Sequence, residues 1–143
     1  MQKVAVIYFN DLGSTVAMAE AVSDGIVYAG AEVEIFEVAE FIIDDINDYD
    51  GVAFGCPEYG DGELEEYEFE PLFSELTDAL GDMPIVLFGS YSTGDGDWME
   101  NWEERCDDLE LNLVASGVVA QDFPDDDVLE DCEILGEKLV EAI

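Results

Sequence analysis

The feature of this sequence that most limits its fold is a repeated alternation of short apolar runs with longer segments of helical period. Five apolar runs bounded by turn residues are predicted to be strands: Val4–Phe9, Val33–Val38, Gly51–Gly55, Ile85–Gly89 and, in broken form, Leu111–Ala120. The runs VAFG and IVLFG are continuously apolar, as strands are when helices cover both faces of a parallel sheet. The alternation therefore predicts βα units and a mainly parallel sheet.

Four segments between and after these strands carry apolar residues at helical spacing and are predicted to be helices: Val16–Ala29, Glu66–Leu80, Trp98–Leu109 and Asp126–Ile143. Gly30 follows the first of them, which is a common helix C-terminal signal. Asp125–Asp127 supply negative charge at the start of the last, where the helix dipole favours it. Phe41–Tyr49 is ambiguous and is read as a helical turn or two. No linker or repeat interrupts the 143 residues, so a single domain, 1–143, is expected.

The charge of the chain excludes several classes of partner. The sequence has 38 acidic residues and only three basic ones, for a net charge of −35. Nucleic acids and anionic membrane surfaces are bound mainly through lysine and arginine, which are too few here to form a patch. The regular spacing of apolar residues indicates a folded body rather than a disordered chain. Most carboxylates are interpreted as a solvated coat, and a minority near the active edge as a docking face for basic partners.

The absence of histidine removes the usual general base and the commonest metal ligand, which argues against hydrolytic triads. Cys56, Cys106 and Cys132 are odd in number, far apart and without a C-x-x-C pair, so they predict reduced thiols rather than disulfides or a metal site. No apolar run reaches the roughly 18 residues of a membrane span. The chain starts directly on a strand pattern, and a cytoplasmic protein without leader or anchor is expected.

Ligand chemistry is expected in the loops that follow the strands, because open parallel sheets bind ligands beyond their carboxyl ends. The loops of interest are Asn10–Thr15, Cys56–Gly62 and Ser90–Asp97. The first leads into a helix N-terminus, whose free N–H groups suit a phosphate. The sequence has neither a Walker lysine nor a G-x-G-x-x-G fingerprint, so amides and hydroxyls alone would bind it. The alternative is an ordinary turn followed by a hydroxyl N-cap.

Three stretches of the chain together resemble a known family. YFNDLGST, GCPEYGDGELEEYEFEPLF and LFGSYSTGDGDWMENWEERC are similar in order, spacing and length to the short-chain flavodoxins, and the similarity covers essentially the whole chain. The long insertion that splits the fifth strand of the long-chain class is missing. The resemblance implies an α/β fold with a doubly wound five-stranded parallel sheet of order 2-1-3-4-5. It also implies bound FMN and the function of a low-potential one-electron carrier rather than an enzyme.

The resemblance also implies which residues contact the cofactor. The phosphate falls on Asn10, Asp11, Leu12, Gly13, Ser14 and Thr15. The edge of the flavin falls on Pro57, Glu58, Tyr59, Gly60, Asp61, Ser90, Tyr91, Ser92, Thr93, Gly94 and Asp95. Tyr59 takes the position on the inner face of the ring, and Thr93 stands where an aromatic often covers the outer face. The peptide that joins Gly60 to Asp61 is the one that turns over when the ring takes up one electron. No catalytic residue and no metal ligand is expected.

Several positions depart from the family pattern. Asn10 and Leu12 stand where members usually have hydroxyls, Asp11 adds negative charge beside the phosphate, and Gly62 replaces a carboxylate found in some members. These departures keep open a second interpretation, a binding or regulatory module of the same architecture that has weakened or lost FMN binding. A flavin-dependent enzyme is a further alternative, although nothing in the sequence supplies a second ligand site. A phosphoacceptor receiver domain is excluded because Cys56, not an aspartate, ends the third strand.

An electron carrier sets its potentials through charge, hydrogen bonds and burial of the ring. Carboxylates at Glu58, Asp61 and Asp95 are expected to disfavour negative charge on the reduced ring and so to lower the second potential. Trp98 and Trp102 are interpreted as packing residues of the third helix. The expected partners are redox proteins with basic docking faces, and the protein is expected to be a monomer.

Overall fold

The parallel sheet predicted from the sequence is present in the computed structural model, which describes residues 2–10, 13–59, 63–92 and 95–143. Its strands are β1 (Lys3–Tyr8), β2 (Glu32–Glu37), β3 (Gly51–Gly55), β4 (Pro84–Tyr91), β5 (Asn112–Leu113) and β6 (Val118–Gln121). They run parallel in the order β2-β1-β3-β4-β5, and β6 also pairs with β4. The predicted α/β fold and strand order are therefore confirmed.

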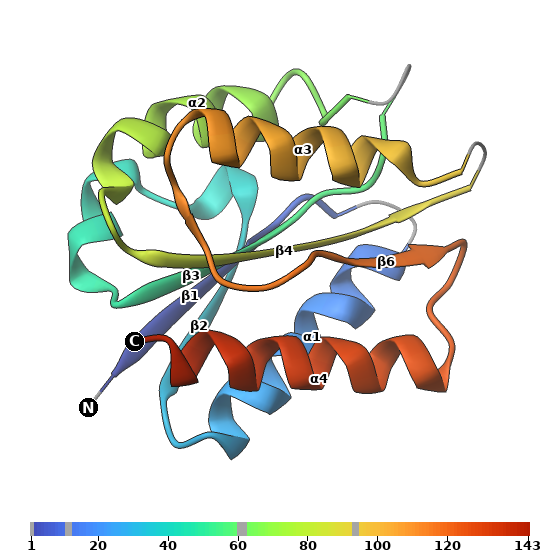
Figure 1. Ribbon diagram of the computed structural model, residues 1–143, viewed down its shortest axis with the longest axis horizontal. Coiled ribbons are helices and arrows are strands. Elements are labelled where there is room, and N and C mark those ends of the chain that lie inside the picture. The colour runs from blue at the N-terminus through green and yellow to red at the C-terminus, as the bar shows by residue number, and fades with distance from the viewer. Residues whose placement is uncertain (1, 11–12, 60–62, 93–94) are drawn as a thin grey trace.

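The helices lie in two layers, one on each face of the sheet (Figure 1). They are α1 (Ser14–Tyr28), α2 (Phe69–Leu80), α3 (Asp97–Asp108) and α4 (Asp126–Glu141). The pair α1 and α4 covers one face, and the pair α2 and α3 covers the other. Each face of the sheet has its own cluster of buried apolar side chains. The sheet thus holds the N-terminal ends of all four helices near the C-terminal ends of its strands, as βα connections require.

The fifth strand is broken, as the sequence predicts. β5 pairs with the start of β4, Pro84 opposite Asn112, and β6 pairs with its end, Phe88 opposite Val118. Between the two pieces, the Gly117 N–H donates to the Glu103 carboxylate at 2.9 Å. A side chain of α3 therefore accepts a hydrogen bond from a backbone N–H that lacks a strand partner because the pairing with β4 is interrupted there.

Two segments differ from their predicted boundaries. The helix predicted over Glu66–Leu80 starts only at Phe69, because the buried Glu65 carboxylate accepts the N–H groups of the residues that precede and begin α2: Tyr67 at 2.8 Å, Glu68 at 2.7 Å and Phe69 at 2.9 Å. The ambiguous segment Phe41–Tyr49 holds a six-residue 3₁₀ helix, Ile43–Asp48, after a shorter one, Val38–Glu40. Short turns of this kind are ordinary connectors.

The two tryptophans pack α3 onto the sheet, as expected. Trp98 is 1% exposed and Trp102 is 2% exposed. The Trp102 ring meets Phe69 and Phe73 edge-on, with centroids 5.5 and 5.7 Å away. Trp102 therefore joins α3 to α2 as well as to the sheet.

Two glycines let α1 and α4 approach each other closely. A Cβ atom at Gly25 would overlap the backbone carbonyl of Glu133 on α4. A Cβ atom at Gly136 would overlap the Val22 carbonyl on α1 and lie 3.0 Å from the Ile26 nitrogen. Both contacts are between backbones, so the separation of the two helices depends on the absence of side chains at these positions.

All three cysteines are buried. Burial raises the pKa of the Cys106 thiol and that of the Cys132 thiol to about 12 each. Because the thiolate is the reactive form, we expect neither thiol to react with iodoacetamide at pH 8 while the protein is folded, and both to react in denaturant. Mass spectrometry of the labelled protein measures this. Labelling of Cys106 or Cys132 at the same rate in buffer and in denaturant would contradict the burial.

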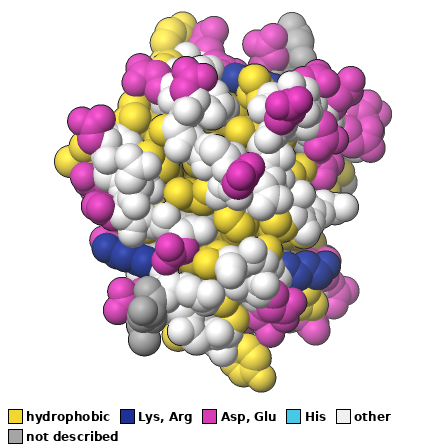
Figure 2. All heavy atoms as spheres, turned by 60° about the vertical axis from the view of Figure 1, so that its left-hand side comes forward, with side chains coloured by type: hydrophobic (Ala, Val, Ile, Leu, Met, Phe, Trp, Pro, Cys, Tyr) yellow, Lys and Arg dark blue, Asp and Glu magenta, His cyan; other side chains and the backbone are white. Residues whose placement is uncertain are grey.

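Groups of acidic side chains are spread over the face shown in Figure 2, and basic side chains occur on it only at separate places. Two of the three basic residues are paired: Lys3 with Glu34 at 2.7 Å, and Arg105 with Glu70 through two hydrogen bonds of 2.7 Å each. These pairs neutralise only a small part of the negative charge. Among the residues that the structure describes, no helix is long and apolar enough to cross a membrane.

Candidate functional site

The predicted site lies where the C-terminal ends of β1, β3, β4 and β6 meet, toward the right of Figure 1. A cavity of about 340 Å³ opens there. Its lining comes from four different connections of the sheet: Ser14, Pro57, Glu58, Ser90, Tyr91, Ser92, Asp122 and Phe123. Three serine hydroxyls, a tyrosine and a phenylalanine give this cavity both hydrogen-bonding groups and aromatic surface.

The N-terminus of α1 forms one side of this site. Its N-cap, Gly13, has φ 101, a left-handed conformation that favours glycine, and no side chain of a described residue caps the helix. In this very acidic chain α1 also has no acidic residue in its first turn, whereas each of the other α-helices described has at least one. A helix N-terminus attracts negative charge. Because α1 has no acidic side chain in its first turn, this attraction is available to an anionic ligand.

The loops after β3 and β4 are tied together at the site. The Glu58 N–H donates to the Ser90 carbonyl oxygen at 2.9 Å. Tyr59 and Glu63 exchange two backbone hydrogen bonds, of 2.8 and 3.3 Å, which close the neck of the loop between them. The Tyr59 ring stands edge-on to Phe9 at 5.9 Å and is 48% exposed. It thus combines a fixed position with an available aromatic surface.

The far end of the same loop is anchored inside the protein. Glu65 is 3% exposed, and its backbone N–H donates to the Cys56 sulfur at 3.5 Å. Its carboxylate holds the start of α2, as described above. The described parts of this connection, residues 56–59 and 63–65, are therefore held in place, and a ligand that contacts them meets preorganised backbone.

Negative charge at the site is already crowded. Burial, followed by the charges of Asp95 and Asp97, raises the pKa of the Glu58 carboxyl. A hydrogen bond with Asp95 and the charge of Asp95 raise the pKa of Asp97. Both shifts mean that adding a further negative charge here costs free energy.

The structure brings together six of the residues predicted for the site, all of which line the cavity: Ser14, Pro57, Glu58, Ser90, Tyr91 and Ser92. Five others lie in the same loops or beside them but are not part of its lining: Asn10, Gly13, Thr15, Tyr59 and Asp95. The predictions for Asp11, Leu12, Gly60, Asp61, Thr93 and Gly94 fall outside the described residues, as does Gly62. No group of acidic or cysteine side chains among the described residues is arranged to hold a metal ion.

Sequence reasoning missed two residues of the cavity, Asp122 and Phe123. They follow β6, whose C-terminal end lies at the same edge of the sheet as the ends of β1, β3 and β4. The rule that ligands bind beyond these ends applies to the last strand too. The broken apolar pattern of this last strand does not mark clearly where the strand ends and the loop begins.

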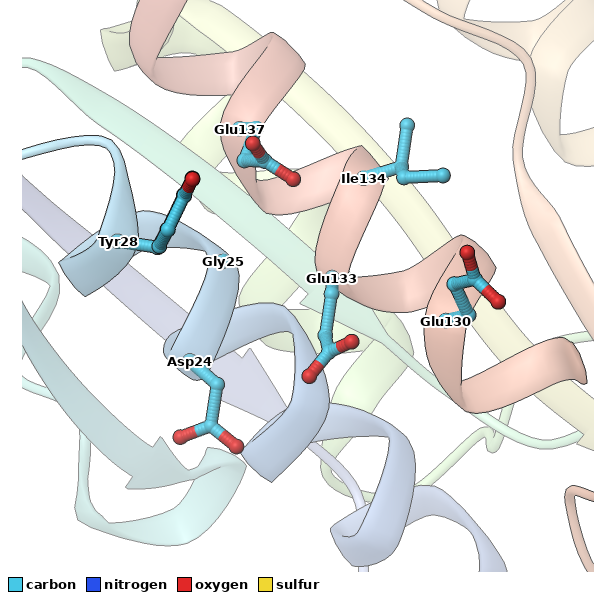
Figure 3. Close-up of a pocket in the computed structure, with 7 residues that line it drawn as sticks. All are labelled: Asp24, Gly25, Tyr28, Glu130, Glu133, Ile134 and Glu137. Atoms are coloured by element: carbon cyan, nitrogen blue, oxygen red, sulfur yellow. The ribbon is translucent and has the colours of Figure 1, made fainter. Parts of the chain in front are cut away.

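A larger hollow lies elsewhere, between α1 and α4 (Figure 3). It measures about 510 Å³ and is lined by Asp24, Gly25 and Tyr28 of α1 and by Glu130, Glu133, Ile134 and Glu137 of α4. It lies where Gly25 contributes no side chain. Four carboxylates and no basic group line it, so its charge repels an anionic ligand. The smaller cavity at the strand ends remains the candidate for the functional site.

Comparison with known proteins shows the family to which the chain is similar. The family model described as Flavodoxin matches residues 6–136. A flavodoxin of Clostridium beijerinckii is 35% identical over 134 residues, which are 94% of this chain and 96% of that protein. One from Megasphaera elsdenii is 34% identical and covers 97% of this chain and 99% of its own. The solution structure of the two-electron reduced Megasphaera elsdenii flavodoxin superposes with a TM-score of 0.87 over 96% of this chain and 98% of that one, at 33% identity.

Proposed function

Because this chain belongs to the flavodoxin family, whose members bind FMN and transfer electrons, we propose that it carries single electrons at low potential with FMN bound in the cavity at the strand ends. It is an electron-transfer protein rather than an enzyme. The observation that carries the site assignment is the cavity itself, which joins the N-terminus of α1 to the loops after β3, β4 and β6. Its hydroxyls and aromatic side chains fit a ligand that combines a phosphate, a polyhydroxyl chain and an aromatic ring.

The phosphate is assigned to the loop of residues 10–15. Its support is the N-terminus of α1, which lacks both a side-chain cap from a described residue and an acidic residue in its first turn. Backbone N–H groups and the Ser14 hydroxyl are the donors that this end of the helix offers. No lysine or arginine is needed there, which agrees with a chain that has only three basic residues.

The flavin ring is assigned to the space between the loop of residues 57–61 and the loop of residues 90–95. The hydrogen bond from Glu58 to Ser90 holds these two loops together, and Tyr59 and Tyr91 provide aromatic surface beside them. Bound FMN supplies the chemistry, the uptake and release of single electrons. The chain orients the ring, shields part of it from water and sets the charge around it.

The low potential follows from the charge of the site. Burial, and after it the charges of Asp95 and Asp97, raises the pKa of Glu58, and a hydrogen bond with Asp95, followed by the charge of Asp95, raises the pKa of Asp97. Electrons that arrive on the ring add negative charge to the same region. The carboxylates therefore make the reduced form less stable and the protein a stronger reductant.

The acidic surface determines the kind of partner. Flavodoxins pass electrons to redox partners, and for this chain we assign partners with basic docking faces, because opposite charges steer two proteins together. Like charges keep copies of this chain apart, which supports a monomer. The single sheet to which the described strands belong supports one domain over residues 1–143. The buried free thiols of Cys106 and Cys132 support a reducing compartment, the cytoplasm.

FMN binding is tested by reconstitution of the purified protein, and Gly13→Val tests where the phosphate lies. The wild-type protein is expected to bind FMN and show the visible flavin absorption bands. Valine at φ 101 costs about 1–2 kcal/mol of strain, and relief of that strain would turn the first N–H groups of α1 away from the phosphate. We expect the Kd for FMN, measured by quenching of flavin fluorescence, to rise roughly tenfold, which corresponds to about 1.4 kcal/mol.

Gly30→Val is the matched control. Gly30 follows α1, has φ 94 and, like Gly13, has no atom within 4 Å of an added Cβ. The same strain at this end should lower stability without changing the Kd for FMN. A protein that stays colourless after reconstitution would contradict the function, and equal affinities of the two variants would contradict the phosphate assignment.

A further inference from the structure

Phe123 is unusual among the phenylalanines of this chain. Seven of the eight are buried or partly buried, and Phe123 alone is exposed, at 63%. Covering an aromatic ring that is exposed to water lowers the free energy, and aromatic rings pack best on other aromatic rings. Because the exposed ring of Phe123 lies at the cavity wall, a ligand that fills the cavity is the group expected to cover it.

The backbone holds Phe123 at the cavity. Asp122 has φ 58, a left-handed conformation that is uncommon outside glycine and best tolerated by asparagine and aspartate. Its N–H donates to the Tyr91 carbonyl oxygen at 2.7 Å and so extends the pairing of β6 with β4 by one residue. The buried Pro124 and the N-cap Asp125 of α4 follow directly. Phe123 thus stands between two fixed points, and its exposure is not the result of a long loop.

The surroundings of Phe123 favour a ligand that is both aromatic and polar. Tyr91 and Pro57 line the same cavity with apolar surface, and Ser14, Ser90 and Ser92 line it with hydroxyls. A phosphate or a ribityl hydroxyl loses hydrogen bonds to water when it is placed against a phenyl ring. The part of FMN that does gain is the flavin ring.

Resting on the proposed function, we propose that Phe123 packs against the flavin of FMN and sets the affinity of the site for the ring. Its role is to contact the cofactor, separately from the phosphate contacts at α1. The contact covers a ring that is otherwise in water, so it strengthens binding without a new charge in a region that is already crowded with carboxylates.

The test compares FMN with riboflavin, which lacks only the phosphate. Phe123→Ala is expected to raise the Kd for both by the same factor of about tenfold, whereas Phe123→Tyr, which keeps the ring, should stay within about twofold of the wild type. Flavin fluorescence quenching gives both constants. The melting temperature of the FMN-free Phe123→Ala protein should equal that of the wild type, because an exposed side chain contributes little to folding.

Tyr28→Ala is the matched control, since Tyr28 is 83% exposed on α1 and does not line this cavity. It should leave both constants unchanged. A Phe123→Ala protein that loses affinity for FMN but not for riboflavin would overturn the proposal, because the contact would then be with the phosphate. Unchanged affinity with slower electron transfer to a protein partner would also overturn it and place Phe123 in a docking surface. A wild-type protein that binds no FMN would instead refute the function on which the proposal rests.

Discussion

Replacing Gly136 by alanine is expected to lower the free energy of unfolding by about 3 kcal/mol, the upper range for overpacking. The added methyl group would overlap the Val22 carbonyl of α1 and lie 3.0 Å from the Ile26 nitrogen. Both neighbours are backbone atoms, so no side chain can rotate away. The helix α4 would have to move off α1 and the sheet, and the buried cluster between them would lose contacts.

Helix propensity alone predicts the opposite sign. Glycine inside a helix is about 1 kcal/mol less favourable than alanine, so Gly136→Ala and Gly25→Ala would each stabilise α4 or α1 as isolated helices. The overlap with the facing helix is the larger effect, because packed interiors do not yield without loss of contacts. We therefore expect Gly25→Ala, which would overlap the Glu133 carbonyl, to be destabilising as well.

Urea unfolding followed by circular dichroism measures these changes. Glu130→Ala is the matched control, because Glu130 is an exposed residue of the same helix α4, and its replacement should change stability by no more than about 0.5 kcal/mol. A Gly136→Ala protein as stable as the wild type would show that the two helices can separate at little cost and that the contact does not control the packing.

Salt is expected to stabilise the protein strongly. A chain of this length has a radius of gyration of about 14 Å, and its net charge of −35 is spread over that volume. The Debye length falls from roughly 30 Å at about 0.01 M to roughly 3 Å at about 1 M salt, so repulsion across the molecule is present at the first concentration and removed at the second. Each kcal/mol of repulsion removed raises Tm by about 4 °C at this size, and we expect a rise above about 10 °C.

The measurement is a thermal melt of the FMN-free protein across a sodium chloride series. The same series near pH 4 is the control, since many carboxylates are protonated there and the salt dependence should shrink. An equal slope at both pH values would point to a general solvent effect of salt. A flat response at neutral pH would show that protons or bound cations already neutralise the carboxylates.

The same screening should act on binding in two directions. FMN brings a phosphate of up to about two negative charges toward an acidic protein, so its affinity should rise with salt. Electron transfer to a basic partner should slow, because screening removes the attraction that steers the two proteins together. A rise in FMN affinity together with a fall in the electron-transfer rate in one salt series separates these effects from a change in folding.

The sequence by itself determined the order of elements, the fold class and the family. Gly51–Gly55 was predicted with the bounds that the structure has, because a short apolar run between turn residues has one favourable state when helices cover both its faces. The acidic start of α4 likewise depends only on neighbouring residues. The Asp125 side chain caps the helix by accepting the N–H of Val128, three residues later, at 2.9 Å. Signals of this kind depend on neighbours along the chain, and they can be read without the fold.

Only the tertiary structure decided the features that depend on contacts between distant segments. Phe69 begins α2 because Glu65 is buried where its carboxylate meets three N–H groups, and nothing in the sequence shows that burial. From the sequence alone, Gly136 is an unfavourable residue inside a helix. The structure shows that glycine is required there, because the backbone of α1 lies where a side chain would be. Phe123 reads as part of a connection until the β4–β6 pairing brings it to the cavity wall. Periodicity specifies which side of an element is apolar, whereas close approach and cavity shape arise only when the elements pack.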